Sequence, residues 1–251
     1  MAPTAKHPSG QLSTAKPAGA TWLDYFAARL HHQCVEGSAG KPEEPLVTQT
    51  VTAIRRRGST TILSLRDAYE QPGDPQATAV ANYTYTFPPN GTVEALPGSD
   101  TNGVVTMNYQ SAVVYPPLSV LRSGGSLTTV QHATWSTTDA QARAQLEQEL
   151  LAGETTAKVN LTYRVSAARA PQQLVTPAGT FRHLLGIRVK LVSMHLLNAR
   201  PQYLHQIQRL SAIFGHPDVI YFARGLGVVG GYGDSLLGDS STLVTALRCT
   251  G

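Results

Sequence analysis

Short alternating runs of β-favourable residues, separated by turn sequences, fill most of this 251-residue chain. These runs have the two-residue period of half-buried strands, and they follow one another at hairpin spacing. No strand–helix–strand rhythm is present, so we expect no Rossmann-like nucleotide site. About ten strands are expected in all, and the clearest runs cover residues 46–67, 79–96, 104–118, 126–138, 155–169, 181–196, 219–233 and 240–249.

The combined pattern predicts a mainly β fold: a curved antiparallel sheet forming a half-barrel or open barrel, with about three short helices. The helices are expected at 22–33, 138–153 and 201–215, where apolar residues recur at helical spacing. Residues 1–20 are rich in Pro, Ala, Gly, Ser, Thr and Lys and predict a flexible N-terminal arm. Residues 21–251 are then one β-rich domain, a length common for all-β folds.

Two segments, 174–196 and 219–233, carry the most specific local signals. Pro177 and Gly179 predict a tight turn, and the residues from Phe181 onward predict one long half-buried strand. Gly225 and Gly227 bracket Leu226 between two apolar runs, which predicts strand, bend, strand. A phosphate-binding loop is not expected at these glycines, because no Lys-Ser/Thr pair follows them.

The distribution of charge gives no reason to expect a nucleic-acid-binding surface. The formal net charge is +4, and charged residues make up only 14% of the chain. The one cationic run, Arg55 to Arg57, lies at an expected hairpin tip, and no aromatic residues interleave with it as a base-stacking surface requires. We interpret it as a solvated turn.

The two cysteines, Cys34 and Cys249, leave two alternatives. They either form a disulfide that joins the N-terminal region to the last predicted strand, or remain separate buried thiols. In the chain-entropy description, closing so long a loop stabilises the fold by on the order of 5 kcal/mol.

No pattern typical of catalysis or metal binding occurs. The eight histidines show no HxH or HExxH spacing, and CxxC and Gly-x-Ser-x-Gly are absent. Glu43 and Glu44 lie in an expected loop, and the side chains of Glu147 and Glu149 point apart on an expected helix. We therefore predict no catalytic residue, no metal site, no cofactor and no enzyme activity.

The chain has no run of eighteen apolar residues, so no transmembrane segment is expected. Its first twenty residues lack the apolar centre of a signal peptide. Two alternatives remain: the protein is cytoplasmic, or a leader has been removed from it.

Three segments in the second half of the chain, 115–127, 174–189 and 219–231, carry a resemblance. In these segments the chain resembles a group of bacterial exported proteins that includes TapB-like proteins. It is also loosely similar to the LolA and LppX half-barrel lipoprotein carriers. The resemblance implies a curved antiparallel sheet in a periplasmic, cell-surface or secreted protein, and it carries over no catalytic residues.

We therefore expect a non-enzymatic extracytoplasmic β-domain whose concave sheet binds an apolar or amphiphilic ligand, such as a lipid, or an envelope protein. The alternative is a structural subunit of a cell-surface or envelope assembly, and a hydrolase with an unrecognised site is a third hypothesis. A carrier predicts an interior apolar cavity of several hundred cubic ångströms, whereas a structural subunit predicts a filled core.

Overall fold

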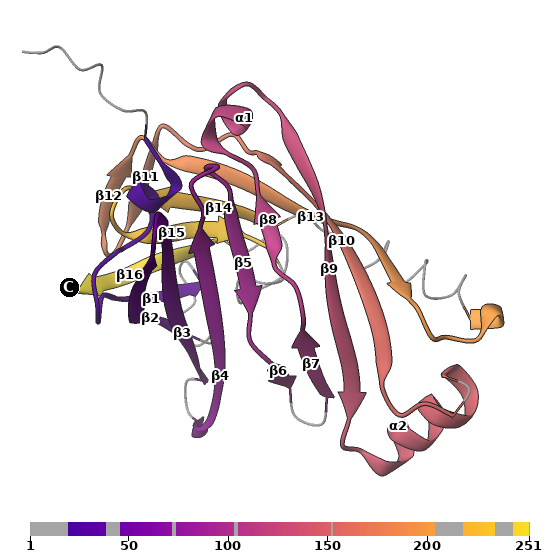
Figure 1. Ribbon diagram of the computed structural model, residues 1–251. Helices are drawn as coiled ribbons and strands as arrows, with labels where there is room; N and C mark the ends of the chain where they lie inside the picture. Colours follow the sequence, from indigo (N-terminus) through magenta and orange to yellow (C-terminus); the bar gives the residue numbers. More distant parts are fainter. Residues whose placement is uncertain are drawn as a thin grey trace, which may run out of the picture.

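A computed structural model describes residues 20–38, 46–71, 74–102, 105–151, 153–203, 218–233 and 243–250. Strands dominate it, which confirms the mainly β prediction (Figure 1). The strands are β1 (Gln33–Ser38), β2 (Leu46–Arg57), β3 (Thr60–Gln71), β4 (Asp74–Phe87), β5 (Val93–Pro97), β6 (Asp100–Asn102), β7 (Val105–Tyr109), β8 (Val113–Tyr115), β9 (Ser126–Thr137), β10 (Ala157–Ala167), β11 (Gln173–Thr176), β12 (Gly179–Arg182), β13 (Leu185–Leu196), β14 (Asp218–Ala223), β15 (Gly227–Tyr232) and β16 (Val244–Thr250).

The helical elements of the described chain are few and short. The α-helices are α1 (Leu118–Arg122) and α2 (Ala140–Gln145), and a π-helical turn, η2 (Leu146–Leu150), continues α2. Two 3₁₀ turns, η1 (Trp22–Tyr25) and η3 (Pro201–Tyr203), complete the set. None of these described helices is long and apolar enough to cross a membrane.

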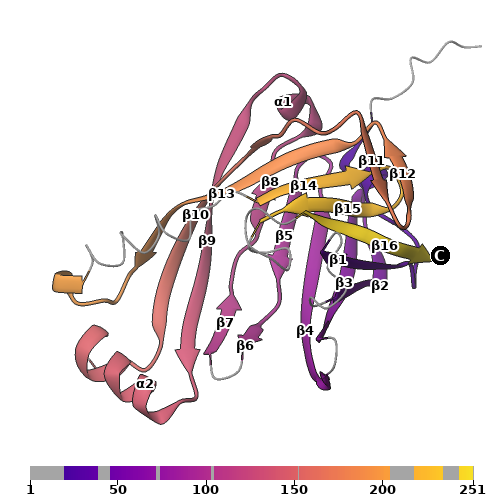
Figure 2. The same ribbon diagram turned by 180° about the vertical axis from the view of Figure 1, so that it is seen from behind.

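Fourteen strands form one antiparallel sheet in the order β6-β7-β9-β10-β13-β14-β15-β16-β1-β2-β3-β4-β5-β8 (Figures 1 and 2). Strand β16 lies between β15 and β1, so it joins the strands β1 to β5 and β8 to the rest of the sheet. The sheet does not close into a barrel, because β6 and β8 remain its two ends. Both ends come from one segment, 93–115, in which β5 pairs with β4 and β7 pairs with β9.

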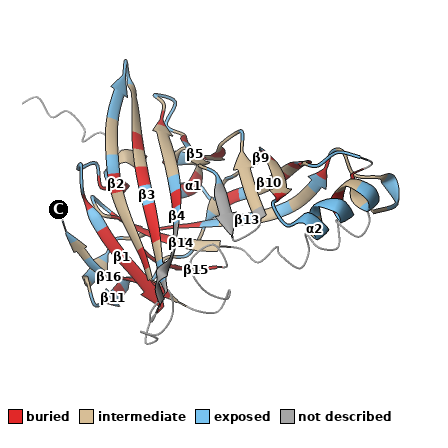
Figure 3. Ribbon diagram, turned by 90° about the horizontal axis from the view of Figure 1, so that it is seen from below, coloured by how far each residue is buried: buried red, intermediate tan, exposed pale blue. Residues whose placement is uncertain are grey.

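The hairpin between β2 and β3 confirms the prediction for residues 46–67. The turn at Gly58 and Ser59 uses a positive φ of 59° at the glycine, and Arg57 pairs with Thr60. Arg55 to Arg57 are exposed at this tip, as Figure 3 shows by the pale end of β2. The cationic run is therefore a solvated turn in the structure.

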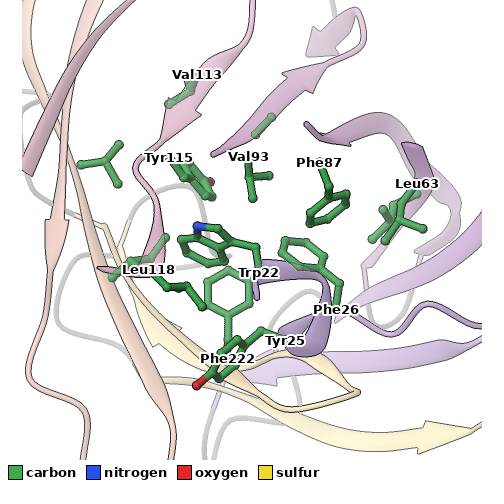
Figure 4. Packing of buried hydrophobic residues seen from close by; sticks show 14 of the residues in the cluster. Trp22, Tyr25, Phe26, Leu63, Phe87, Val93, Val113, Tyr115, Leu118 and Phe222 are labelled. Atoms are coloured by element: carbon green, nitrogen blue, oxygen red, sulfur yellow. The ribbon is translucent and has the colours of Figure 1, made fainter. Parts of the chain in front are cut away.

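The main core lies on the inner face of the curved sheet and is filled by aromatic side chains (Figure 4). Trp22 and Phe26 enter it from η1 and its end, and Phe26 lies 5.1 Å from Phe87 and 5.5 Å from Phe222, centroid to centroid. Because Phe87 belongs to β4 and Phe222 to β14, strands far apart in the sheet order contact the same side chain. The sheet must therefore curve around this core.

The expected helix at 22–33 is wrong beyond its first turn. The backbone amide of Thr21 donates to the Asp24 carboxylate at 2.6 Å, which caps this first turn. However, only Trp22–Tyr25 is helical, His31 has a φ of 64°, and β1 begins at Gln33. Burial of the aromatic residues in the sheet core decides the path of this segment rather than helical periodicity.

The helix expected at 138–153 is present as α2 and η2. The Asp139 carboxylate accepts a hydrogen bond from the amide of Ala142 at 2.7 Å, which makes Asp139 the N-cap. Leu146 and Leu151 pack with Leu161 and Leu196 in a second small core at the far end of β10 and β13. Most of α2 itself is exposed (Figure 3).

The long strand expected from Phe181 onward is wrong, because the chain forms two strands there. Pro177 occupies the turn between β11 and β12, as predicted, and Thr176 pairs with Gly179. His183 then adopts a φ of 56° and ends β12 before β13 begins at Leu185. A left-handed residue cannot continue an extended strand, so the hairpin turns away from the main sheet.

This β11–β12 hairpin covers the outer face of β14 to β16. Leu174 and Phe181 pack there with Tyr221 and Ala246 in a third core. A separate close approach occurs where the chain leaves β10 beside the start of β13: a β-carbon at Gly186 would lie 2.6 Å from the carbonyl oxygen of Ala168. Glycine is needed at that position because the neighbouring atoms belong to the backbone.

Two expectations concern residues that the structure describes only in part. Of the helix expected at 201–215, only the 3₁₀ turn η3 falls among the described residues. The arm expected at 1–20 lies outside them except for Ala20. The short helix α1 was not predicted, because its five residues are too few to show a helical period.

Candidate functional site

A groove of about 500 Å³ opens at the rim of the curved sheet, beside the aromatic core. It lies where η1, the turn between β4 and β5, and α1 meet. Its apolar wall is built by Trp22, Leu23, Phe87 and Leu118, with Pro88, Pro89 and Pro117 beside them. A hollow of this volume falls within the range of small-molecule sites in proteins.

The groove wall is held rigidly by its contacts with the core. The indole Nε1 of Trp22 donates to the carbonyl oxygen of Pro116 at 2.8 Å, and the Trp22 ring lies 5.7 Å from that of Tyr115. Leu118 is buried at the start of α1. These contacts fix the aromatic floor before any ligand binds.

Arg122 supplies the only ionisable side chain of the described lining. It lies in the last turn of α1 and is exposed, and no described residue forms a salt bridge with it. The other polar lining residues are neutral: Thr21, Ser59, Thr61, Asn90, Thr92 and Ser119. Within the part of the chain that the structure describes, the groove therefore combines an apolar wall with one cation that forms no salt bridge.

Gly225 and Gly227, which the sequence singled out, support this wall from behind. They lie at the hairpin turn between β14 and β15, with φ values of 73° and 93°. The amide of Gly225 donates to the carbonyl oxygen of Asp24 at 2.8 Å, and the Arg224 guanidinium lies 5.7 Å from the Tyr25 ring centroid. The turn thus anchors η1, while Pro177, Gly179 and Phe181 lie in the separate β11–β12 hairpin.

A cluster of acidic side chains is buried on the inner face of β1 to β3. On β2, Gln49 is paired with Asp67 of β3, and Val47 is paired with Glu36 of β1. Val47 and Gln49 are two residues apart and share one face of β2, so the two acids lie on the same face of the sheet. Glu36 is only 6% exposed and Asp67 8%, and one oxygen of each has no hydrogen-bond partner. Such groups are costly to bury in the charged form.

Burial, reinforced by the neighbouring Asp67, therefore raises the pKa of Glu36 to about 8. Burial also raises the pKa of Asp67 to about 7, although a hydrogen bond from the Gln49 side chain opposes this. Desolvation likewise raises the pKa of the phenols of Tyr83 and Tyr85 on the adjoining strand. The cluster favours protonated, neutral side chains.

Cys34 and Cys249 form a disulfide between directly opposed positions of β1 and β16. The structure therefore contains the first of the two alternatives drawn from the sequence. His32 Nε2 lies 3.4 Å from Cys34 Sγ. Burial and Arg29 lower the pKa of His32, which favours the neutral ring. The side chains of His32, Cys34 and Cys249 place their potential metal-ligand atoms within 4.8 Å of one another. Metal binding by cysteine needs a thiolate, and the disulfide leaves neither sulfur in that form.

Sequence reasoning missed Arg122, Glu36 and Asp67. A signal for Asp67 was present, since it alternates with Leu63 and Leu65 and so occupies an inward position of its strand. No comparable signal marks Arg122, because the groove depends on how η1 and α1 meet in space.

A smaller hollow of about 350 Å³ lies away from the rim groove, between α2 and the end of β9. Trp135, Leu146, Leu150 and Tyr203 form its apolar part. It is bounded partly by the exposed helix rather than by the main core, so its shape depends on α2.

Comparison with known proteins gives distant structural likenesses only. No protein-family model and no curated protein sequence matches the chain. A protein from Bacteroides fragilis, described as exported and with a YmcC-like fold, is 10% identical with a TM-score of 0.49, over 90% of this chain and 98% of that one. A protein from Parabacteroides distasonis, described as a lipoprotein, is 8% identical with a TM-score of 0.49 over the same shares.

Both likenesses are too distant to decide the fold or the function. The resemblance to TapB-like proteins and to the LolA and LppX carriers is not shown by these matches and stays a prediction.

Proposed function

We propose that this protein is a non-enzymatic extracytoplasmic binding domain that holds an acidic amphiphile in the rim groove. The observation that carries the proposal is the combination of a rigid apolar wall, built on Trp22 and Leu118, with Arg122, to which no described residue forms a salt bridge. A single acyl chain would contact the wall, and its carboxylate or phosphate would meet the guanidinium. Arginine suits this role because its planar fork binds such anions through two hydrogen bonds.

The proposed ligand site differs in place from the one expected from the sequence. We expected binding within the concave sheet, but Trp22, Phe26, Phe87 and Phe222 already fill the inner face. The rim groove lies at the open end of that filled core. The proposal therefore requires a curved, open sheet that binds its ligand at the rim and not in an interior cavity.

A binding role, rather than catalysis, is supported by the composition of the groove. Its described lining contains no histidine, cysteine, aspartate or glutamate. General acid–base and nucleophilic catalysis usually depend on such side chains within hydrogen-bond reach of the substrate. The buried acids Glu36 and Asp67 do not belong to this lining.

An extracytoplasmic location is supported by the disulfide between Cys34 and Cys249. Structural disulfides persist in oxidising compartments and are rare in the cytosol. The periplasm, the cell surface and secretion all satisfy this condition.

The second candidate function is a structural subunit of an envelope assembly. The filled inner face favours it, because a subunit of this kind needs a solid core and no ligand. It predicts that the protein forms discrete oligomers and that the rim groove contacts another protein.

Tryptophan fluorescence can test the amphiphile proposal, because the chain contains only two tryptophans. In a Trp135→Phe background, Trp22 reports on the groove alone. Titration with lauric acid should change its emission, and Arg122→Gln should weaken binding of the acid at least about fivefold, the loss of about 1 kcal/mol expected for a charge-assisted contact.

Two controls make the test specific. Arg182→Gln, which changes an exposed arginine on β12, should leave the affinity for lauric acid unchanged. Lauryl alcohol, which has no carboxylate, should bind Arg122→Gln as tightly as the protein with Arg122. No emission change with lauric acid, together with a discrete oligomer in native mass spectrometry, would reject the amphiphile and support the structural subunit.

A further inference from the structure

The outer face of β9, β10 and β13 lies on the side of the sheet away from the core, and its side chains are exposed or half-buried. Register places Thr128, Arg164 and Lys190 in one row across the three strands. Ser126, Ser166 and Arg188 form the next row. Alternate residues of a strand share a face, so the three cations lie together.

This cationic group is unfavourable within the isolated protein. Arg164 and Lys190 are directly opposed, and Arg188 is two residues from Lys190 on the same face. Like charges directly opposite each other across strands destabilise a sheet. All three side chains are exposed, and the described contact of Arg164 is a hydrogen bond from its Nε to the Ser126 hydroxyl at 3.2 Å.

No carboxylate on these three strands balances the charge. From the row of Ser126 to the row of His132, every residue that they direct to this face is neutral, basic or a histidine. Asp218, on the neighbouring β14, is opposite Val189 and so belongs to the inward rows. The face therefore presents concentrated positive charge to any partner.

Two exposed apolar side chains accompany the cations. Val130, in the row next to Arg164, is 44% exposed, and Val192, the extra residue at the β13 bulge, is 52% exposed. A soluble polyanion would meet cations alone, whereas a bilayer offers phosphates to the cations and an acyl boundary to the valines.

From this juxtaposition we infer that the outer face of β9, β10 and β13 docks on an anionic lipid bilayer as a peripheral surface. Arg164, Arg188 and Lys190 contact lipid phosphates, and Val130 and Val192 enter the headgroup region. The inference uses a different face from the rim groove and does not rest on the function proposed for it.

Vesicle co-sedimentation tests this docking at low ionic strength. The full chain should bind vesicles of equal parts phosphatidylglycerol and phosphatidylcholine, and should not bind phosphatidylcholine alone. Each basic residue near an anionic membrane contributes about fivefold to affinity, so Arg164→Gln, Arg188→Gln and Lys190→Gln combined should lose on the order of 100-fold. Val130→Ser with Val192→Ser should also weaken binding.

The hairpin tip provides a matched control for net charge. Replacing Arg55, Arg56 and Arg57 by glutamine removes the same number of exposed cations and should change the affinity by less than about fivefold. Arg122→Gln should have no effect, which separates docking from groove binding. Thermal unfolding followed by circular dichroism must show each variant to be folded.

Three outcomes would overturn the inference. The first is an absence of binding by the wild type, and the second is an equal loss in the two triple variants. The third is heparin binding that competes with vesicles while the valine substitutions change nothing, since that result identifies a soluble polyanion as the partner.

Discussion

Replacing Glu36 by glutamine should make the protein much less sensitive to rising pH. The carboxyl of Glu36 is buried, with its pKa raised from 4.5 to about 8. At about 1.4 kcal/mol per pKa unit, the full shift corresponds to about 5 kcal/mol of folding free energy. Within the window from about pH 5 to pH 8, about 3 to 4 kcal/mol of this should be lost.

The sign of the effect follows from proton binding. Between pH 4.5 and about 8, the folded protein keeps the Glu36 proton and the unfolded chain has released it. Stability falls with pH wherever the folded state binds more protons. The stabilising contribution is therefore complete below pH 4.5 and is lost as the pH rises toward 8.

Urea unfolding of the disulfide-intact protein at about pH 5 and pH 8 measures this difference. Glu36→Gln should be close to wild type or somewhat less stable at the lower pH, since a buried amide needs partners of its own. At the higher pH it should be the more stable protein. Asp67, whose pKa is also raised, should leave the variant a smaller residual pH dependence.

Glu94→Gln, an exposed change on β5, is the matched control and should retain the wild-type pH dependence. Equal pH dependence in wild type and Glu36→Gln would refute the argument. It would mean that the Glu36 carboxyl is ionised or solvated in the folded protein.

Two further predictions concern stability. Replacing both Cys34 and Cys249 by alanine opens a loop of 215 residues and should cost about 5 kcal/mol in urea unfolding; a loss under about 1 kcal/mol would contradict the chain-entropy argument. Gly186→Ala should cost about 2 to 3 kcal/mol, because its β-carbon meets the backbone oxygen of Ala168 at 2.6 Å. Gly37→Ala, whose β-carbon would meet only leucine side-chain atoms, should cost less, and the reverse order in thermal unfolding would disprove the backbone clash.

The strands could be predicted from the sequence because their signals are local. Alternation and turn residues identified the β2–β3 hairpin, and Gly225 with Gly227 marked the turn between β14 and β15. The N-cap of α2 is also local, because the Asp139 carboxylate accepts from the amide of Ala142, three residues later. Each of these features depends on residues within a few positions of one another.

The errors arose where tertiary contacts decide the local structure. Trp22 and Phe26 have helical spacing, yet the chain leaves the helix after Tyr25 so that both rings enter the sheet core. His183 follows β-favourable residues and still turns left-handed, where the β11–β12 hairpin folds over β14. Nothing in the nearby sequence specifies either packing partner.

The candidate site was the least predictable part. The rim groove needs η1, the β4–β5 turn and α1, which are far apart in the chain. The outer cationic face needs the register of β9, β10 and β13 before Arg164 and Lys190 become neighbours. Sequence spacing alone cannot show either arrangement.

The position of β16 between β15 and β1 constrains the order of events during synthesis. Until β16 has left the ribosome, β1 lacks one of its two neighbours, and the strands β1 to β5 and β8 have no hydrogen-bonded connection to the rest of the sheet. Such non-local pairing makes folding slow. Formation of the Cys34–Cys249 bond would therefore report that a nascent chain has assembled both halves, and a chain cut short before β16 would remain a target for chaperones and proteases.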